Sequence, residues 1–105
     1  MVVAALRERV EVRRIVRTSD GMGGFTESET VVGTARGRIV ALGDAVPEVV
    51  AERLGGRPGY QVVLDGRTGP AVQPSDVLVG SDGRRYVAVS ASRQGRVAFV
   101  TAAEA

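Results

Sequence analysis

Apolar and charged residues alternate over residues 6–17, LRERVEVRRIVR, near the start of the chain. The apolar face would hold Leu6, Val10, Val12 and Val16, and the opposite face would hold Arg7, Arg9, Glu11, Arg13 and Arg17. This alternation predicts a half-buried strand, and the β-branched residues favour a strand over the competing helix. Arg14 and Ile15 each fall on the wrong face, so we expect a bulge or an edge position there.

A second alternating segment runs from Phe25 to about Val40 and predicts a long strand. Its inward positions include Gly33, Ala35 and Gly37, and such small residues suggest a bend or close packing against another layer. The two strands flank the stretch DGMGG, residues 20–24. A phosphate-binding loop would need a helix after its glycines, whereas a Thr- and Glu-rich strand follows here. We therefore interpret the glycines as a hairpin turn that requires positive φ.

Residues 41–59, ALGDAVPEVVAERLGGRPG, change to a helical pattern. The apolar positions with helical spacing are Val46, Val50 and Leu54, while Pro47 suits a first turn and Gly55 can end the helix. A helix this short needs packing to persist. The segment at about 42–58 is therefore either a cap over one end of a barrel or an excursion that becomes ordered against a partner.

The C-terminal half predicts four more strands, over residues 60–65, 77–80, 84–92 and 96–101. An irregular loop with two prolines covers residues 66–76, and Asp82-Gly83 is a strong hairpin signal. The last residues, TAAEA, are expected to fray. The whole pattern predicts a mainly β chain: a small antiparallel β-barrel or sandwich of about six strands with one short helical insertion. We expect a single domain over residues 1–105.

The sequence contains no cysteine and no histidine, and all 14 of its basic residues are arginine. These absences exclude disulfides, thiolate or imidazole catalysis, Schiff bases and nearly all zinc sites. Several carboxylates lie in predicted turns, where they normally hydrogen-bond the backbone: Asp20, Asp65, Asp76 and Asp82. We therefore expect no enzyme, no metal site and no cofactor.

No apolar run approaches the roughly 20 residues that a membrane span needs. The first apolar residues precede the positive charges, which is the reverse of a secretory signal. We expect a protein that is made and used inside a cell.

The formal net charge of +2 permits contact with DNA without requiring it. The arginines of the first strand would form a row that meets phosphates or an acidic protein surface. We favour the alternative, in which Glu11, Glu27 and Glu29 neutralise the row across the hairpin. Phe25 and Phe99 are expected in the core, so few aromatic residues remain for a single-strand nucleic-acid platform.

Several of these features occur in an order known from another group of proteins. The early positions are Arg9 and Val12 in the first strand, then Asp20, Gly23, Gly24 and Phe25 in the hairpin. The later positions are Pro74, Val77 to Val79, Asp82, Gly83, Arg84, Tyr86 and Val87. In this order they resemble the head–tail joining proteins of tailed bacteriophages, also called head-closure or stopper proteins. The resemblance covers about residues 6–101, with residues 42–58 as a variable insertion.

The resemblance implies a small β-barrel that assembles as a ring beneath the portal or its adaptor. Such a ring extends the DNA channel, helps to retain packaged DNA and offers a docking surface to the tail. The implied partners are further copies of the chain in the symmetry of the portal, the portal or adaptor protein, tail proteins, and DNA passing without sequence specificity. The resemblance implies no membrane partner. The implied location is the neck of the virion, after synthesis in the host cytoplasm.

The hairpin at 20–24 and the 42–58 excursion are expected to contact neighbouring subunits or the channel. The candidate interface or channel residues are Arg13, Arg17, Asp20, Met22, Arg36, Arg38, Glu48, Glu52 and Arg53. Two other functions stay open. One is a tail-completion protein on the tail side of the same joint, and the other is a small nucleic-acid-binding β-barrel.

Overall fold

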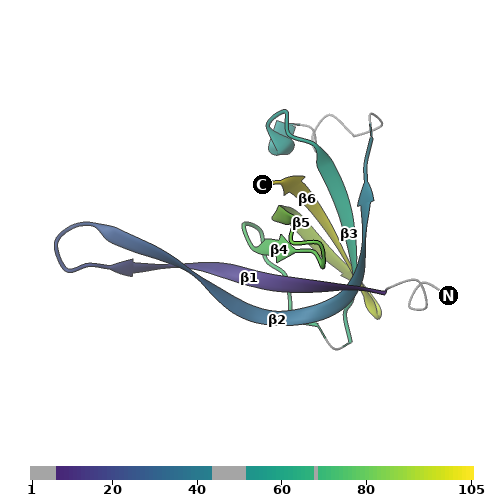
Figure 1. Ribbon diagram of the computed structural model, residues 1–105, viewed down its shortest axis with the longest axis horizontal. Helices are drawn as coiled ribbons and strands as arrows, with labels where there is room; N and C mark the ends of the chain where they lie inside the picture. The colour runs from purple at the N-terminus through teal and green to yellow at the C-terminus, as the bar shows by residue number, and fades with distance from the viewer. Residues whose placement is uncertain (1–6, 44–51, 68) are drawn as a thin grey trace.

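The strands close into an antiparallel β-barrel, which confirms the predicted fold class (Figure 1). The computed structural model describes residues 7–43, 52–67 and 69–105, and six strands lie within these ranges. They are β1 (Glu8–Ser19), β2 (Phe25–Ala41), β3 (Gly59–Asp65), β4 (Val77–Val79), β5 (Arg85–Gln94) and β6 (Val97–Glu104). Their order around the barrel is β1-β2-β3-β6-β5-β4, and β4 pairs with β1 to complete the circle. Closure pairs the backbone groups that an open sheet would leave free at its edges.

The core inside the barrel consists mostly of small and medium-sized side chains. Its buried cluster contains Val10, Val12, Ala35, Val62, Leu64, Leu78, Tyr86, Ala88, Val100 and Ala102. Tyr86 meets Tyr60 edge-to-face, with ring centroids 4.9 Å apart. Neither phenylalanine belongs to this cluster: Phe99 is half-buried and Phe25 is 62% exposed. The prediction that Phe25 belongs to the core is therefore wrong, because β2 carries it beyond the end of the barrel.

Close packing explains the small inward residues of β2, as predicted. A Cβ atom at Gly37 would lie 2.6 Å from Leu64 Cδ2 and 2.7 Å from the Val63 carbonyl oxygen. At Gly33 it would lie 3.3 Å from the Pro70 ring. Larger side chains at these positions would push β2 away from its neighbours.

A β-bulge interrupts the pairing of β1 and β2 between Val12 and Arg13, next to the two residues that break the sequence alternation. Val12 pairs with Gly33 and Arg13 pairs with Val31, so Val32 is the extra residue on β2. Such a bulge bends its strand and increases the local twist. Here it lies where the hairpin leaves the barrel.

Arg14 follows the bulge and forms a two-point ion pair with Asp76. Its Nε and Nη2 donate to the two carboxylate oxygens of Asp76 at 3.0 and 2.9 Å. Nη2 also donates to the Ala71 carbonyl at 3.1 Å, and Asp76 accepts the backbone N–H of Gln73 at 2.8 Å. Asp76 is 2% exposed, so this charge has left water almost completely. The hydrogen bond to Asp76 raises the pKa of Arg14 above its ordinary value.

The helical prediction can be tested only at its end. Residues 52–54 form a helical turn, and Gly55 has a φ of 61° and donates its N–H to the Glu52 carbonyl. The predicted stop at Gly55 is therefore confirmed, and Leu54 is buried. Val46, Pro47 and Val50 lie outside the described residues.

The C-terminus is ordered in β6, so the prediction that it frays is wrong. Ala102 and Ala103 are fully buried, and their strand pairs with β3 and β5. The outward-facing Glu104 accepts a hydrogen bond from Arg84 Nη2 at 3.1 Å.

Replacing Asp76 by Asn should destabilise the protein by about 2–3 kcal/mol, because it leaves the Arg14 charge without its counter-ion. The cost falls below that of a fully buried pair because a third of the Arg14 side chain, 33%, is exposed. Chemical denaturation at neutral pH measures the loss. Asp82→Asn is the control, since Asp82 is an exposed turn residue whose carboxylate accepts the backbone N–H of Arg84. Equal losses for the two variants would contradict a special role for the ion pair.

Candidate interaction surface

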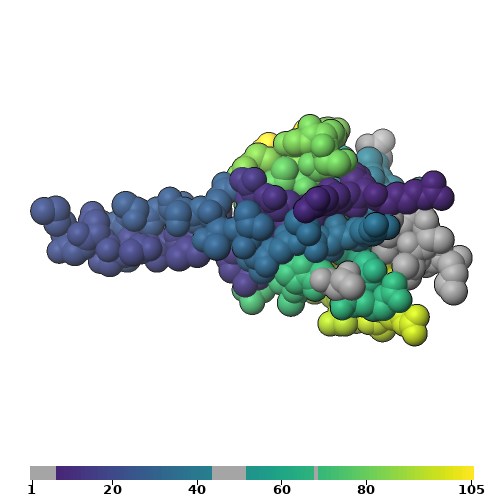
Figure 2. All heavy atoms as spheres, turned by 60° about the horizontal axis from the view of Figure 1, so that its bottom comes forward, coloured from purple at the N-terminus to yellow at the C-terminus, as the bar shows by residue number. Residues whose placement is uncertain are grey.

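The hairpin of β1 and β2 continues far beyond the barrel as a two-stranded ribbon. β1 pairs with β4 only over Glu11–Arg13, and β2 pairs with β3 only over Gly37–Ala41. Residues 14–32, which we call the distal ribbon, therefore have strand pairing only with each other. The ribbon accounts for the elongated shape of the molecule, with extents of 52 × 32 × 26 Å (Figures 1 and 2).

The tip of the ribbon is a glycine turn organised by Asp20. The Asp20 carboxylate accepts the backbone N–H groups of Met22 at 2.7 Å and Gly24 at 3.1 Å. Gly21 and Gly23 have φ values of 78° and 85°, a region that favours glycine. The predicted hairpin turn is confirmed. The backbone N–H groups of Met22 and Gly24 are occupied by the chain's own carboxylate.

Exposed apolar side chains concentrate on the distal ribbon. The large hydrophobic residues exposed in the described part of the chain are Ile15, Val16, Met22, Phe25, Val31, Val32 and Val40, and all but Val40 lie on the ribbon. Met22 at the tip is 90% exposed, and Phe25 next to the tip is 62% exposed. Exposed apolar side chains gathered on one element in this way commonly mark a contact with another molecule.

The two faces of the ribbon differ in chemistry. The register places Ile15 opposite Glu29, Arg17 opposite Glu27 and Ser19 opposite Phe25 on one face. The opposite face carries Val16, Thr18, Thr26, Ser28 and Thr30, and is rich in hydroxyl groups. On the first face the Arg17 guanidinium lies 5.0 Å from the centre of the Phe25 ring, a cation–π contact. This face therefore combines apolar and aromatic side chains with charged ones.

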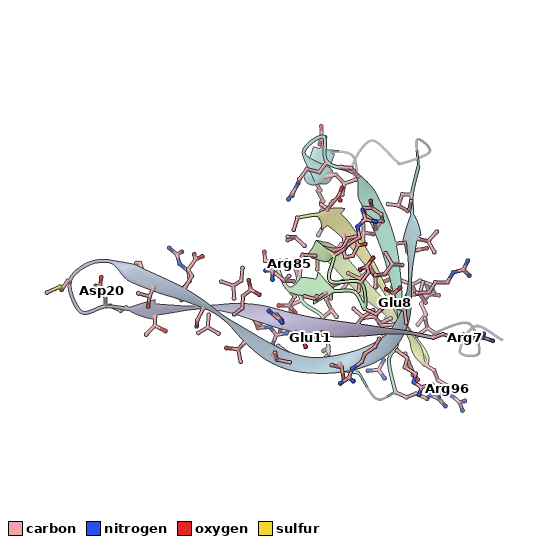
Figure 3. The ribbon with its side chains drawn as sticks, viewed as in Figure 1. Arg7, Glu8, Glu11, Asp20, Arg85 and Arg96 are labelled. Atoms are coloured by element: carbon pink, nitrogen blue, oxygen red, sulfur yellow. The ribbon has the colours of Figure 1, made fainter. Side chains whose placement is uncertain are left out.

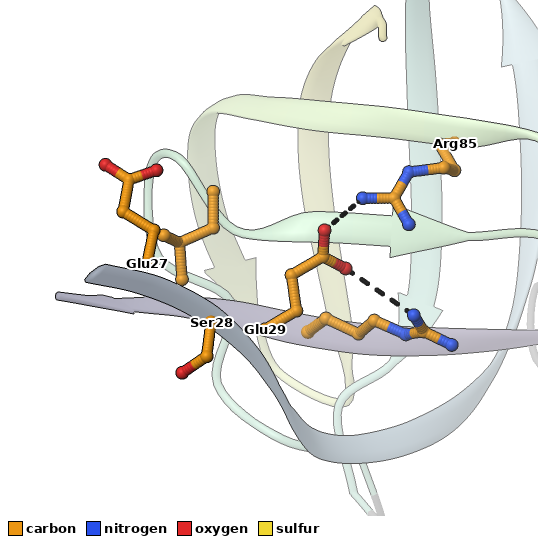
Figure 4. A pocket seen from close by; sticks show the side chains of 6 residues that line it. Glu27, Ser28, Glu29 and Arg85 are labelled. Carbon is orange, nitrogen blue, oxygen red and sulfur yellow. Dashed lines mark hydrogen bonds and ion pairs between the residues drawn. The ribbon is translucent and has the colours of Figure 1, made fainter. Parts of the chain in front are cut away.

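Glutamates neutralise the arginines of this half of the hairpin, as favoured from the sequence. Arg17 lies 3.4 Å from Glu27, and Arg13 lies 3.5 Å from Glu29. Arg13 also pairs with Glu11, and Arg85 from β5 pairs with the second oxygen of Glu29. Glu29 thus links the ribbon to the barrel wall (Figure 4).

A groove of about 410 Å³ lies beside these ion pairs at the base of the ribbon. It is lined by Arg13, Ile15, Glu27, Ser28, Glu29 and Arg85 (Figure 4). Because its charges are largely paired with each other, it suits an uncharged or mixed protein surface better than a highly charged ligand.

The predicted interface residues do not gather at one site. Arg13, Arg17, Asp20 and Met22 belong to the hairpin, Arg36 and Arg38 lie on the outer face of β2, and Glu52 and Arg53 are exposed in the helical turn. Glu48 lies outside the described residues. The sequence reasoning missed Ile15, Phe25 and Val31. The sequence signal for this exposed apolar surface is Ile15, an apolar residue on the charged face of a predicted strand.

The described residues hold no group of three or more His, Cys, Asp or Glu side chains that could bind a metal ion. In the same part of the chain, no helix is long and apolar enough to cross a membrane. A comparison of the chain with protein-family models, with curated proteins and with solved structures finds no match.

The hydrogen bond from Arg85, together with the Arg13 charge, holds the pKa of Glu29 below its ordinary value. Glu29 therefore stabilises the fold fully above about pH 4.5, its ordinary pKa, and this contribution is lost as pH falls through the lower folded-state value. We expect Glu29→Gln to be slightly less stable than the parent at pH 7. The difference should shrink on acidification from pH 5 to pH 3, measured by denaturation at each pH.

Ser28→Ala is the matched control, since Ser28 lines the same groove without a charge. Its stability relative to the parent should not change over this pH range. A gap between Glu29→Gln and the parent that stays constant down to pH 3 would contradict the role of this ion pair.

Proposed function

We propose that the protein is a structural subunit of the neck of a tailed bacteriophage. In this role it joins the DNA-filled head to the tail and helps to close the channel. The order of sequence features over residues 6–101 supports the proposal. The main structural support for the proposal is the distal ribbon. Its exposed apolar side chains and strand edges are of no benefit to an isolated chain, whereas an assembly can cover them.

A two-stranded ribbon is at best marginally stable in water without further packing. The distal ribbon nevertheless exposes six large apolar side chains and the unpaired outer edges of both strands. Covering them with a second protein surface would remove apolar area from water and satisfy backbone groups. A partner protein would therefore supply the packing and the backbone hydrogen bonds that the ribbon lacks.

A closed barrel with one projecting arm suits a ring. In a cyclic ring each subunit uses two different surfaces, one for each neighbour. The ribbon and the barrel wall are two such surfaces, since they differ in shape and in exposed apolar area (Figure 2). Barrel closure also directs association to the arm, because the barrel strands are already paired.

The proposed partners are further copies of this chain, the portal or adaptor protein of the head, and proteins of the tail. DNA would pass through the ring without being read by sequence. The work of such a subunit is done by contacts and requires no chemical step.

Replacing Met22 and Phe25 together by Ser should abolish attachment to heads while leaving the barrel folded. Both side chains are exposed at or near the tip, so their loss removes contact area and little of the core. The measurement is co-sedimentation with DNA-filled, tailless heads that lack the protein. The unmodified chain should sediment with the heads, and the double variant should stay at the top of the gradient.

Val40→Ser is the matched control, since Val40 is an exposed apolar residue that lies off the ribbon. It should attach like the unmodified chain, and thermal melts should establish that all three proteins are folded. Attachment by the double variant would refute the role of the ribbon. Binding of the unmodified chain to isolated tails and not to heads would replace the proposal with the tail-completion function.

A further inference from the structure

Four exposed arginines occupy the outer face of the barrel where β1 and β2 run side by side. Arg9 of β1 lies directly opposite Arg36 of β2. Alternation along the strands places Arg7 and Arg38 on the same side. We call these residues the proximal arginine face: Arg7, Arg9, Arg36 and Arg38.

This face contrasts with the other half of the same two strands. Beyond the bulge, each arginine of β1 has a carboxylate partner within 3.5 Å. On the proximal arginine face, like charges stand opposite each other, a pairing that destabilises a sheet. Within the described residues, the side chains of Arg9 and Arg38 have no hydrogen bond and no ion pair. Like charges left opposite each other cost stability, and such a departure from a stabilising pattern is typical of a functional surface.

The carboxylates nearest in the fold are already engaged. Glu8 accepts hydrogen bonds from the backbone and the hydroxyl of Ser81, and Glu11 pairs with Arg13. Asp65 pairs with Arg67, which, with a smaller influence of Arg36, holds the pKa of Asp65 below its ordinary value. The charges of Arg9 and Arg38 are therefore available to an external anion.

The shape of the face excludes a single small anion as its main ligand. A broad, shallow basin of about 560 Å³ is lined by Arg7, Arg9, Thr34, Ala35 and Arg36. Alternate residues of a strand lie about 7 Å apart, and neighbouring strands lie about 5 Å apart. The arginines are thus spread over a surface and do not converge on one point, which suits a chain of regularly spaced anions.

The residues that line the basin also favour a nucleic acid over an acidic protein as its ligand. Protein interfaces normally have an apolar or aromatic centre, and no large apolar side chain lines this basin. Six of the seven large hydrophobic residues exposed in the described part of the chain lie instead on the distal ribbon, at the other end of the molecule; the exception is Val40, two residues beyond Arg38 on β2. Figure 3 shows this separation, with Arg7 at one end and Asp20 at the other. Arginine binds phosphate oxygens in a two-point geometry, and no aromatic ring is present here to stack on bases.

We propose that the proximal arginine face binds the phosphate backbone of double-stranded nucleic acid without sequence preference. The inference does not depend on the neck assignment, because it concerns the isolated chain. It assigns the contact to the barrel wall and leaves the distal ribbon free for protein partners.

The test is fluorescence anisotropy of a labelled 20-base-pair DNA duplex with the purified chain, over a series of salt concentrations. Arg9→Gln with Arg36→Gln removes two charges from the face. This variant should weaken binding at least about tenfold at low salt, and should lower the slope of log K against log salt by about 2. Arg17→Gln with Arg53→Gln is the control, since it removes two charges from exposed residues elsewhere. The control should keep the slope of the parent, and melting curves should establish that both variants are folded.

Two results would overturn the proposal. One is equal weakening by the two double variants, which would assign binding to net charge alone. The other is an unmodified chain that binds poly-glutamate but not the duplex at low salt, which would assign the face to an acidic protein. Head attachment plays no part in this assay. A failure to bind DNA would therefore leave the neck proposal untouched, and a failure to attach to heads would leave the DNA-binding proposal untouched.

Discussion

The ion pair between Arg14 and Asp76 determines where the barrel ends and the ribbon begins. Before the bulge, Val10 and Val12 of β1 point inward and belong to the core. At Arg14 the same face receives a charge, which is held by a nearly buried carboxylate from the loop before β4. That carboxylate also fixes the loop through the Gln73 N–H, so one pair joins a strand, a loop and the end of the core. Beyond it the hairpin has no third strand to pack against and continues as an arm.

The charge pattern of the hairpin changes at the same point. On the ribbon side of the bulge, Arg13 and Arg17 are neutralised by glutamates, and apolar residues are exposed between them. On the barrel side, Arg9 and Arg36 face each other without such partners. A neutral apolar surface suits a protein, and a bare positive surface suits a polyanion. A single strand pair thus presents two kinds of surface at opposite ends of one molecule, as a subunit that joins other components around DNA would require.

The strands, the hairpin turns and the fold class could be predicted from the sequence because they depend on local alternation and on turn residues such as Asp20 and Gly83. The bulge could be anticipated from the broken alternation at Arg14 and Ile15. The ion-pair partner of Arg14 could not, since Asp76 lies 62 positions further along the chain. The sequence predicts Phe25 in the core because the chain has few large side chains to fill it. Its exposure follows from the length of β2 beyond the barrel. The arginine row likewise appeared continuous in the sequence, and only the register with β2 divides it into a neutralised half and a positive half.

The central claim is that the distal ribbon is an assembly arm of a neck ring. Cryo-electron microscopy of DNA-filled, tailless heads incubated with the purified protein tests it most directly. The account predicts new density below the portal, in a ring of barrels, with each ribbon tip and its Met22 packed against a neighbouring subunit or the portal. A ring in which the ribbons project into solvent, or heads that gain no density at this vertex, would contradict it.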